Sequence, residues 1–285
     1  MRKIMTRCVD AHHHLWKYSA EKYGWIGDEM PMLRRDFLPP ELYDEMIAAG
    51  VQASIAIQAR QTFDETRWLL HLAEQHAYIA GVVGWAPIAD SGFREQLETL
   101  AGHPKLKGLR HVLQDEPDDY MLRGSFQRGL AALQGTGLVY DILIYERQLS
   151  FATQLVDRHP NQVFVLDHLA KPKICAAEIS PWRRRLRELA LRPNVHCKLS
   201  GMVTEADWNQ WKIVDLHPYV EVAVECFGPA RLLAGSDWPV CTIAASYGKW
   251  WQTLRELISG LSSAEQAGIL GGNASRVYSL SEEAL

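Results

Sequence analysis

Eight short apolar runs, spread along the whole chain, most constrain what this sequence can fold into. The runs span residues 6–14, 52–59, 79–86, 106–112, 137–144, 162–169, 194–201 and 231–238. Most are apolar on both faces instead of alternating, which is typical of parallel strands that are covered on each side. Their number predicts a parallel sheet of eight strands.

The segments between the runs have the pattern of amphipathic helices. Residues 64–77 gather apolar side chains such as Leu69 on one face, and residues 181–193 do the same around Leu186 with their arginines outward. Eight strand–helix units without a linker or low-complexity stretch predict an α/β fold, a single (β/α)8 TIM barrel that spans residues 1–285.

A doubly wound open sheet is the alternative architecture. It would ordinarily carry a glycine-rich phosphate loop after its first strand. Neither GxGxxG nor GxxxxGK[ST] follows residues 6–14, and the "GGNAS" near the end of the chain is not such a loop. The barrel is therefore favoured.

Charge and hydropathy exclude several kinds of partner. A formal net charge of -4 and a pI near 6.3 leave no basic footprint for nucleic acid. No window approaches the roughly 18 apolar residues of a membrane span, so we expect no membrane partner. The first ten residues lack the apolar core of a secretory signal, which predicts a cytoplasmic protein. We assign no oligomeric state from the sequence.

Polar side chains gather toward the carboxyl ends of the runs, where (β/α)8 barrels carry their chemistry. These residues are Asp10, His12, His14, Lys107, Arg110, His111, Asp141, Asp167, His168, Lys198, Ser200 and Asp237. Residues two apart on a strand point to the same side, so His12 and His14 can share a ligand while His13 faces away. Two rigidly held imidazoles can chelate a divalent cation. An ordinary pair of core or surface histidines is the alternative.

Several motifs resemble the amidohydrolase superfamily. "VDAHHHLW" is similar to its Asp-x-His-x-His opening, "LDHLAKP" to its strand-six histidine and "GSDWP" to its strand-eight aspartate. The closing "ILGGNASRVYSL" resembles the terminal helix of the amidohydrolase 2 group. "RRDFLPPEL", "QARQTFDETRWLLHLA" and "LKGLRHVLQ" resemble the branch that contains sugar lactonases, such as L-fuconolactone and L-rhamnonolactone hydrolases. The resemblance covers residue 9 to about residue 280.

This resemblance implies a hydrolase that opens a small sugar lactone, of the L-fucono-lactone kind, to the aldonic acid. It implies one divalent metal, with zinc as the first choice, held by His12, His14, His168 and Asp237. Metal-dependent members add a histidine on strand five, but the fifth run reads "VYDILI", with Asp141 in its place. Lys107 lies too early in the fourth run to bridge two metals. We therefore expect one metal that can bind but that activity does not require.

Asp237 is the expected general base, because a carboxylate that faces a lactone carbonyl can take a proton from attacking water. A helix N-cap is its alternative role. His168 could ligate metal, orient Asp237 or hydrogen-bond the oxyanion; alternatively it is a buried histidine tied to the backbone. Arg110 or His111 could polarise the ester carbonyl or hold a sugar hydroxyl, and strand alternation lets only one of them point inward.

Three tryptophans adjoin these motifs. Trp16, Trp25 and Trp238 could pack on the C–H faces of a sugar, although core packing is equally compatible with each position. Two other functions stay open: a metal-dependent decarboxylase of the amidohydrolase 2 group, and a barrel that binds a sugar acid without turning it over. The decarboxylase would more strictly need a complete metal site.

Overall fold

The computed structural model describes residues 7–281, and its eight strands follow one another around one sheet in chain order. They are β1 (Val9–His13), β2 (Ala53–Ile57), β3 (Ile79–Gly84), β4 (Leu106–Val112), β5 (Val139–Leu143), β6 (Phe164–Leu166), β7 (Val195–Leu199) and β8 (Leu232–Ala234). All neighbours from β1–β2 to β7–β8 pair in parallel. The predicted parallel sheet is confirmed. Thr6 of the first run and both ends of the expected domain span, 1–6 and 282–285, lie outside the described residues.

Backbone hydrogen bonds bring the first strand against the chain that follows the last one. The amide of Asp237 donates to the carbonyl of His12 at 2.7 Å, and the amide of His14 donates to the carbonyl of Trp238 at 2.6 Å. A parallel bridge pairs His13 with Trp238 between these two bonds. The sheet is thus a nearly closed barrel, and the predicted (β/α)8 architecture is confirmed.

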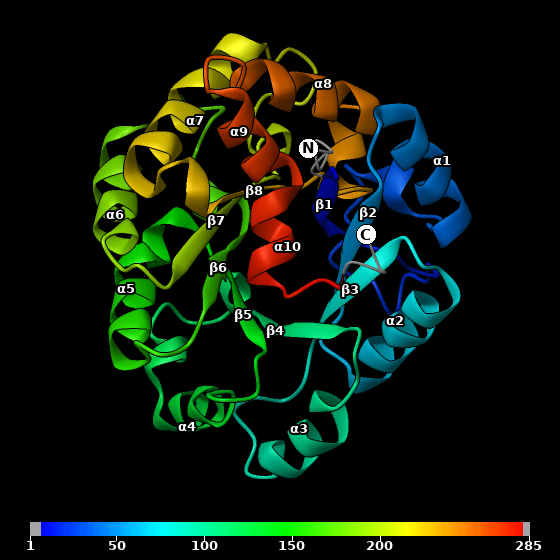
Figure 1. Cartoon of the computed structure of the whole chain (residues 1–285), viewed down its shortest axis with the longest axis vertical. Helices are drawn as coiled ribbons and strands as arrows, with labels where there is room; N and C mark the ends of the chain where they lie inside the picture. Colours follow the sequence, from blue (N-terminus) through cyan, green and yellow to red (C-terminus); the bar gives the residue numbers. More distant parts are fainter. Residues whose placement is uncertain (1–6, 282–285) are drawn as a thin grey trace, which may run out of the picture.

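Figure 1 shows helices around the ring of strands and α10 over its middle. The helices are α1 (Pro39–Ala49), α2 (Phe63–Gln75), α3 (Phe93–Ala101), α4 (Gly124–Ala132), α5 (Leu149–Arg158), α6 (Ser180–Ala190), α7 (Ile213–Phe227), α8 (Tyr247–Leu257), α9 (Ser263–Ala267) and α10 (Asn273–Val277). The helices predicted over 64–77 and 181–193 are α2 and α6. The side chain of Thr62 caps α2 by accepting the amide of Glu65 at 3.3 Å.

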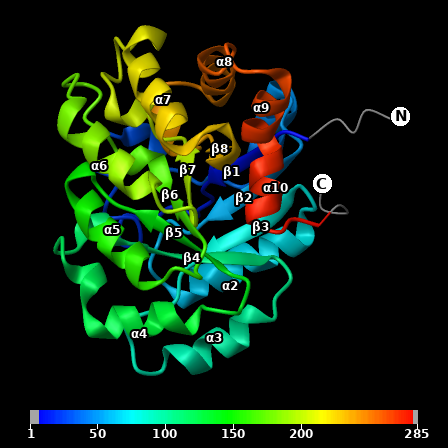
Figure 2. The same cartoon turned by 60° about the vertical axis from the view of Figure 1, so that its left-hand side comes forward.

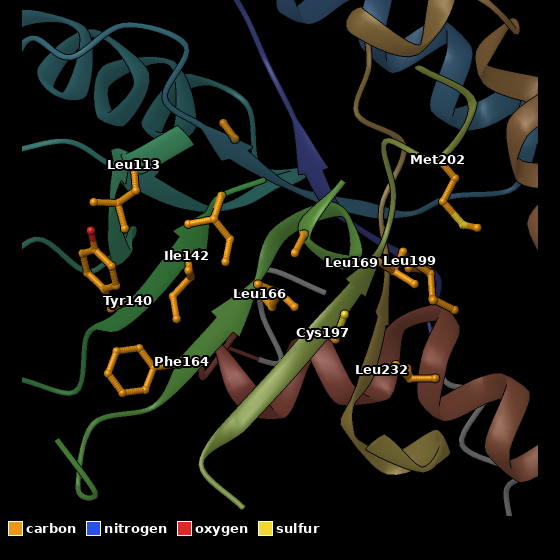
Figure 3. Packing of buried hydrophobic residues seen from close by; sticks show 14 of the residues in the cluster. Leu113, Tyr140, Ile142, Phe164, Leu166, Leu169, Cys197, Leu199, Met202 and Leu232 are labelled. Carbon is orange, nitrogen blue, oxygen red and sulfur yellow. The ribbon is translucent and has the colours of Figure 1, made fainter. Parts of the chain in front are cut away.

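The outer core lies between strands and helices. In Figure 3, Tyr140 and Ile142 of β5 lie beside Phe164 and Leu166 of β6, and the register pairs Tyr140 with Phe164 and Ile142 with Leu166. The rings of Tyr140 and Phe164 meet edge to face, with centroids 6.2 Å apart. Because side chains alternate along a strand, Asp141 between them faces the barrel interior.

The C-terminal segment closes the end of the barrel where the strands begin. Figures 1 and 2 show α10 against the ring of strands, near the start of β1. Gly271, just before α10, lies so close to the carbonyl of Arg7 that an added Cβ would meet it at 1.9 Å. Beyond the helix, Tyr278 and Leu280 join the small apolar cluster inside the barrel. Chemistry is therefore confined to the opposite end of the barrel.

Within residues 7–281, no helix is long and apolar enough to cross a membrane. The cytoplasmic location inferred from the sequence stays a prediction.

Candidate active site

A cavity of about 830 Å³ opens at the carboxyl ends of the strands. Its base includes four of the polar residues predicted to converge there: His14, Arg110, His168 and Asp237. Its walls come from the loops that follow the strands, as is general for (β/α)8 barrels.

An irregularity in β1 sets the direction of the histidines. Asp10 pairs with Ser54 and His13 pairs with Ala56, so β1 carries one residue more than β2 between these points. An extra residue of this kind interrupts the alternation of side chains along the strand. As a result His12 turns inward although Asp10, two residues before it, does not.

The prediction that Asp10 lies at the mouth of the barrel is wrong. Its carboxylate accepts hydrogen bonds from the Ser236 hydroxyl at 2.6 Å and from the Tyr247 hydroxyl of α8 at 3.1 Å. It is fully buried between strand and helix, and burial raises its pKa to about 6. Asp10 therefore braces the junction of β1 with the segment after β8 and does not line the cavity.

Three histidines and one aspartate meet around one point. The Nε2 atoms of His12 and His14 are 3.2 Å apart. Oδ1 of Asp237 lies 3.7 Å from Nε2 of His12, 3.4 Å from Nε2 of His14 and 3.8 Å from Nε2 of His168. The convergence predicted for these four residues is present in the structure.

The opposite nitrogen of two of these rings is held by a fixed partner. Nδ1 of His14 lies 2.9 Å from the carbonyl of Ile57 and donates its proton to that oxygen, which leaves Nε2 directed at the cluster. Nδ1 of His168 lies 2.8 Å from the Ser200 hydroxyl. Beside that ring, Gly201 has a φ of +61°, and a Cβ there would meet Nδ1 of His168 at 2.5 Å. Only glycine fits.

His168 does not lie in β6 itself, which ends at Leu166. It begins a left-handed turn in which four consecutive residues, 168–171, have φ between 50° and 59°. Such a conformation costs roughly 1–2 kcal/mol per residue, so packing must hold it. Trp182 of α6 contributes by donating its indole N–H to the carbonyl of Leu169 at 2.7 Å. The turn brings His168 and Lys171 into the cavity.

The charge states of the site follow from burial. Burial lowers the pKa of His12 well below its usual range and that of His168 to about 4, so both imidazoles are neutral near pH 7. Burial alone would raise the pKa of Asp237, but His168 and His14 outweigh it and the pKa lies below its ordinary value. Asp237 is therefore an ionised proton acceptor beside the neutral rings of His12 and His168.

Two cations and two carboxylates lie behind His12, fully or almost fully buried. The ammonium of Lys198 lies 2.5 Å from Asp141, 2.9 Å from Asp167 and 3.3 Å from Nδ1 of His12. Arg110 donates to Asp167 at 2.9 Å and to the carbonyl of Gln58. The residue that replaces the expected strand-five histidine, Asp141, thus neutralises a lysine.

The residues present fit one divalent cation. Three Nε2 atoms and one carboxylate oxygen match the ligands that zinc prefers, and ligand atoms of His12, His168 and Asp237 lie within 4.8 Å of one another. Partners on Nδ1 are what metal-binding histidines ordinarily have. One contact weakens the binding of a metal at this site. Nη1 of Arg110 lies 3.4 Å from Nε2 of His12, so the guanidinium competes with a metal ion for the lone pair of that nitrogen.

Besides Asp10, four predicted positions lie away from the cavity: His111, Trp16, Trp238 and Lys107. Arg110 faces it, and His111 points to the other side of β4, where its ring lies 3.2 Å from the indole nitrogen of Trp85 and 3.1 Å from Glu116. Trp16 and Trp238 are buried against Phe37. They have no surface to offer a substrate.

The fourth position is at the other end of the barrel. The amine of Lys107 donates to the carbonyl of Ser279, in the segment that closes the start of the strands. Of the expected aromatic wall only Trp25 lines the cavity, with 42% of its surface exposed.

Several residues of the cavity wall were not predicted from the sequence. They are Arg60, Gln61, Thr62, Tyr145, Lys171, Thr204, Glu205 and Trp208. Each follows an apolar run by a few positions, so extending the search from the strand ends into the loops would have found them.

A (β/α)8 barrel with a histidine–aspartate cluster at the carboxyl ends of its strands defines an enzyme of the amidohydrolase type. Residues 9–280 match the family described as Amidohydrolase, and the chain belongs to this family. It is 43% identical to an L-fucono-1,5-lactonase of Burkholderia multivorans over 97% of both chains. It is 34% identical to an L-fucono-1,5-lactonase of Burkholderia ambifaria over 96% of both chains.

A solved structure gives the same relationship in three dimensions. An amidohydrolase of Burkholderia multivorans with bound zinc is 43% identical and superposes with a TM-score of 0.93. The match covers 96% of this chain and 100% of that one.

Proposed function

We propose that this protein is a lactonase that hydrolyses a sugar lactone of the L-fucono-lactone kind to the aldonic acid. The observation that carries the proposal is the buried carboxylate of Asp237, which lies within 3.4–3.8 Å of three histidine rings at the base of a cavity with a polar wall. The similarity to two L-fucono-1,5-lactonases supports the same substrate class.

Asp237 acts as the general base. It takes a proton from a water whose oxygen forms a bond to the lactone carbonyl carbon. The carbonyl oxygen becomes an oxyanion, and the guanidinium of Arg110 stabilises it from the cavity base. As the tetrahedral centre collapses, the bond to the ring oxygen breaks and the proton held by Asp237 passes to that oxygen. The products are one carboxyl group and one hydroxyl group.

The proposed metal is one zinc ion on His12, His14, His168 and Asp237. When bound it supplies a Lewis acid for the carbonyl oxygen. A lactone is an activated ester, and the guanidinium of Arg110 lies in the same place, so we propose that activity does not require the ion.

The cavity wall suits a small polyhydroxylated ring. Gln61, Thr62 and Thr204 offer hydrogen-bonding groups for sugar hydroxyls, and Trp25 and Trp208 offer aromatic faces for C–H surfaces. We propose a cytoplasmic role in carbohydrate metabolism with a small molecule as the partner. No observation favours a decarboxylase. An ionised base inside the cavity favours catalysis over a barrel that binds a sugar acid without turning it over.

The test is a panel of L- and D-aldono-lactones of both ring sizes, with acid release followed at constant pH. We expect turnover of at least one sugar lactone, no CO₂ release, and slower cleavage of simple aryl acetates. The Asp237→Asn variant, assayed in parallel, controls for spontaneous hydrolysis. Faster cleavage of aryl acetates than of every sugar lactone would contradict the substrate class, and CO₂ release would indicate the decarboxylase.

A further inference from the structure

A buried carboxylate on α2 touches two separate parts of the cavity wall. Oε2 of Glu65 accepts the amides of Ala59 at 3.0 Å and of Arg60 at 2.6 Å. Oε1 of the same side chain accepts the hydroxyl of Tyr23, in the loop after β1, at 3.4 Å. We call these four residues the Glu65 bracket.

Both loops that the bracket joins line the cavity. Ala59 and Arg60 lie in the wall themselves. Tyr23 lies between two further wall residues, Lys22 and Trp25. The bracket therefore determines how one side of the wall stands relative to the other, although Glu65 does not line the cavity.

Aromatic and cationic contacts extend the bracket. The guanidinium of Arg60 lies over the ring of Tyr23 at 5.6 Å. The rings of Tyr23 and Trp25 each pack against Trp16, with centroids 5.7 and 5.8 Å away. Two loops distant in sequence thus form one unit around the carboxylate.

Burial of the Glu65 carboxylate opposes folding, because the charged group loses its hydration. Glu65 is only 3% exposed, and burial raises its pKa to about 7, even though the amides of Arg60 and Ala59 favour the ionised form. An apolar side chain would avoid that desolvation cost. What Glu65 provides instead is an acceptor for two consecutive backbone N–H groups of the half-buried cavity wall.

We propose, resting on the lactonase function above, that Glu65 is a positioning residue that holds the wall formed by residues 59–62 and the loop after β1, and thereby sets substrate affinity. The bracket does not touch the general base, because the contacts of the Asp237 carboxylate are with His12, His14 and His168. Loss of Glu65 should therefore raise KM and leave kcat nearly unchanged.

The experiment compares Glu65→Ala and Glu65→Gln with Glu265→Ala on the substrate that the lactone panel identifies. Glu265 is a matched control, because its carboxylate also accepts an amide at a helix start, that of Ser262 at 2.8 Å, but on α9. We expect Glu65→Ala to raise KM by about tenfold or more while kcat changes by less than about threefold. Glu265→Ala should change neither constant.

The glutamine variant keeps an acceptor oxygen but loses the charge. Neutral hydrogen bonds are about half as strong, so KM should rise by about two- to fivefold. A folded Glu65→Ala protein with unchanged KM, or with a fall in kcat alone, would overturn the proposal. If the alanine variant does not fold, an unchanged KM in Glu65→Gln overturns it in the same way.

Hydrogen exchange separates this proposal from the lactonase function. If the wild-type protein opens no lactone, the function fails but the bracket remains testable. Faster amide exchange over residues 58–62 in Glu65→Gln than in Glu265→Ala then supports the bracket. Equal exchange in the two variants overturns it.

Discussion

Nη1 of Arg110 lies 3.4 Å from Nε2 of His12, so a permanent cation touches the ring that would bind a metal. The same guanidinium pairs with Asp167 and is anchored by the carbonyl of Gln58. A fixed positive group at the cavity base can stabilise negative charge on a substrate oxygen, the work otherwise done by a metal. It also repels a second cation.

Replacement of Asp237 by asparagine should remove the proton acceptor and keep the shape of the side chain. We expect kcat to fall by at least about 10²-fold, as is typical when a general base is lost. The melting temperature, measured beside the assay, verifies that the variant is folded. Near-normal hydrolysis by such a folded variant would assign the activation of water to another group.

The acid side of the pH profile should be flat over an unusual range. Asp237 has a pKa below its ordinary value, and burial lowers that of His168 to about 4. A lowered carboxyl pKa keeps the base ionised as the pH falls, and activity is lost only when the pH passes through it. We expect kcat to hold from pH 7 to about pH 5. A limb centred near pH 6.5 would indicate a histidine that titrates at its ordinary value.

The Arg110→Met variant should remove the positive charge from the cavity base while an unbranched side chain still fills the space. Loss of one oxyanion donor typically costs about 10²- to 10³-fold in kcat, and we expect a decrease of this size on the lactone. Arg110→Lys should recover part of it, because the charge remains and the planar fork does not. Arg184→Met, at an exposed site on α6, serves as the control. Full activity in a folded Arg110→Met protein would remove the guanidinium from the mechanism.

Chelation should affect activity only weakly. After treatment with a chelator, and elemental analysis to verify that metal is gone, we expect kcat/KM to change by less than about tenfold, or about 1.4 kcal/mol. The reason is that Arg110 already places a positive group in the site. Complete loss of activity, with full recovery on addition of zinc or manganese, would instead make His12 and His14 obligatory ligands.

The tryptophans should divide into two groups. Trp208 lines the cavity, so Trp208→Ala should raise KM, since an aromatic face against a sugar is worth on the order of 1 kcal/mol. Trp16 is fully buried outside it, and Trp16→Ala should lower the free energy of unfolding by about 3–5 kcal/mol. Denaturant titration and steady-state kinetics on both variants test this. A Trp208→Ala protein with unaltered KM and reduced stability would reverse the assignment.

Local pattern was sufficient to predict the barrel and the centre of its site. Continuous apolar runs mark strands covered on both faces, and their alternation with helical segments leaves few architectures. The carboxyl ends of parallel strands converge in a barrel, so His14, His168 and Asp237 could be brought together from their positions in the sequence alone. Because side chains alternate along a strand, the spacing of two residues also predicted that His12 and His14 share a site.

Only the tertiary structure decided which way each polar side chain faces. The extra residue in β1 turns Asp10 toward α8, the orientation of β4 puts Arg110 inside and His111 outside, and the left-handed turn after β6 aims His168. Register, strand orientation and turn geometry are set by packing between distant segments. Trp16 and Phe37, near the two ends of the loop between β1 and α1, pair in an antiparallel bridge and pack edge to face, and such contacts bury Trp16. A periodic pattern places a residue on an element, whereas its neighbours in space determine what it touches.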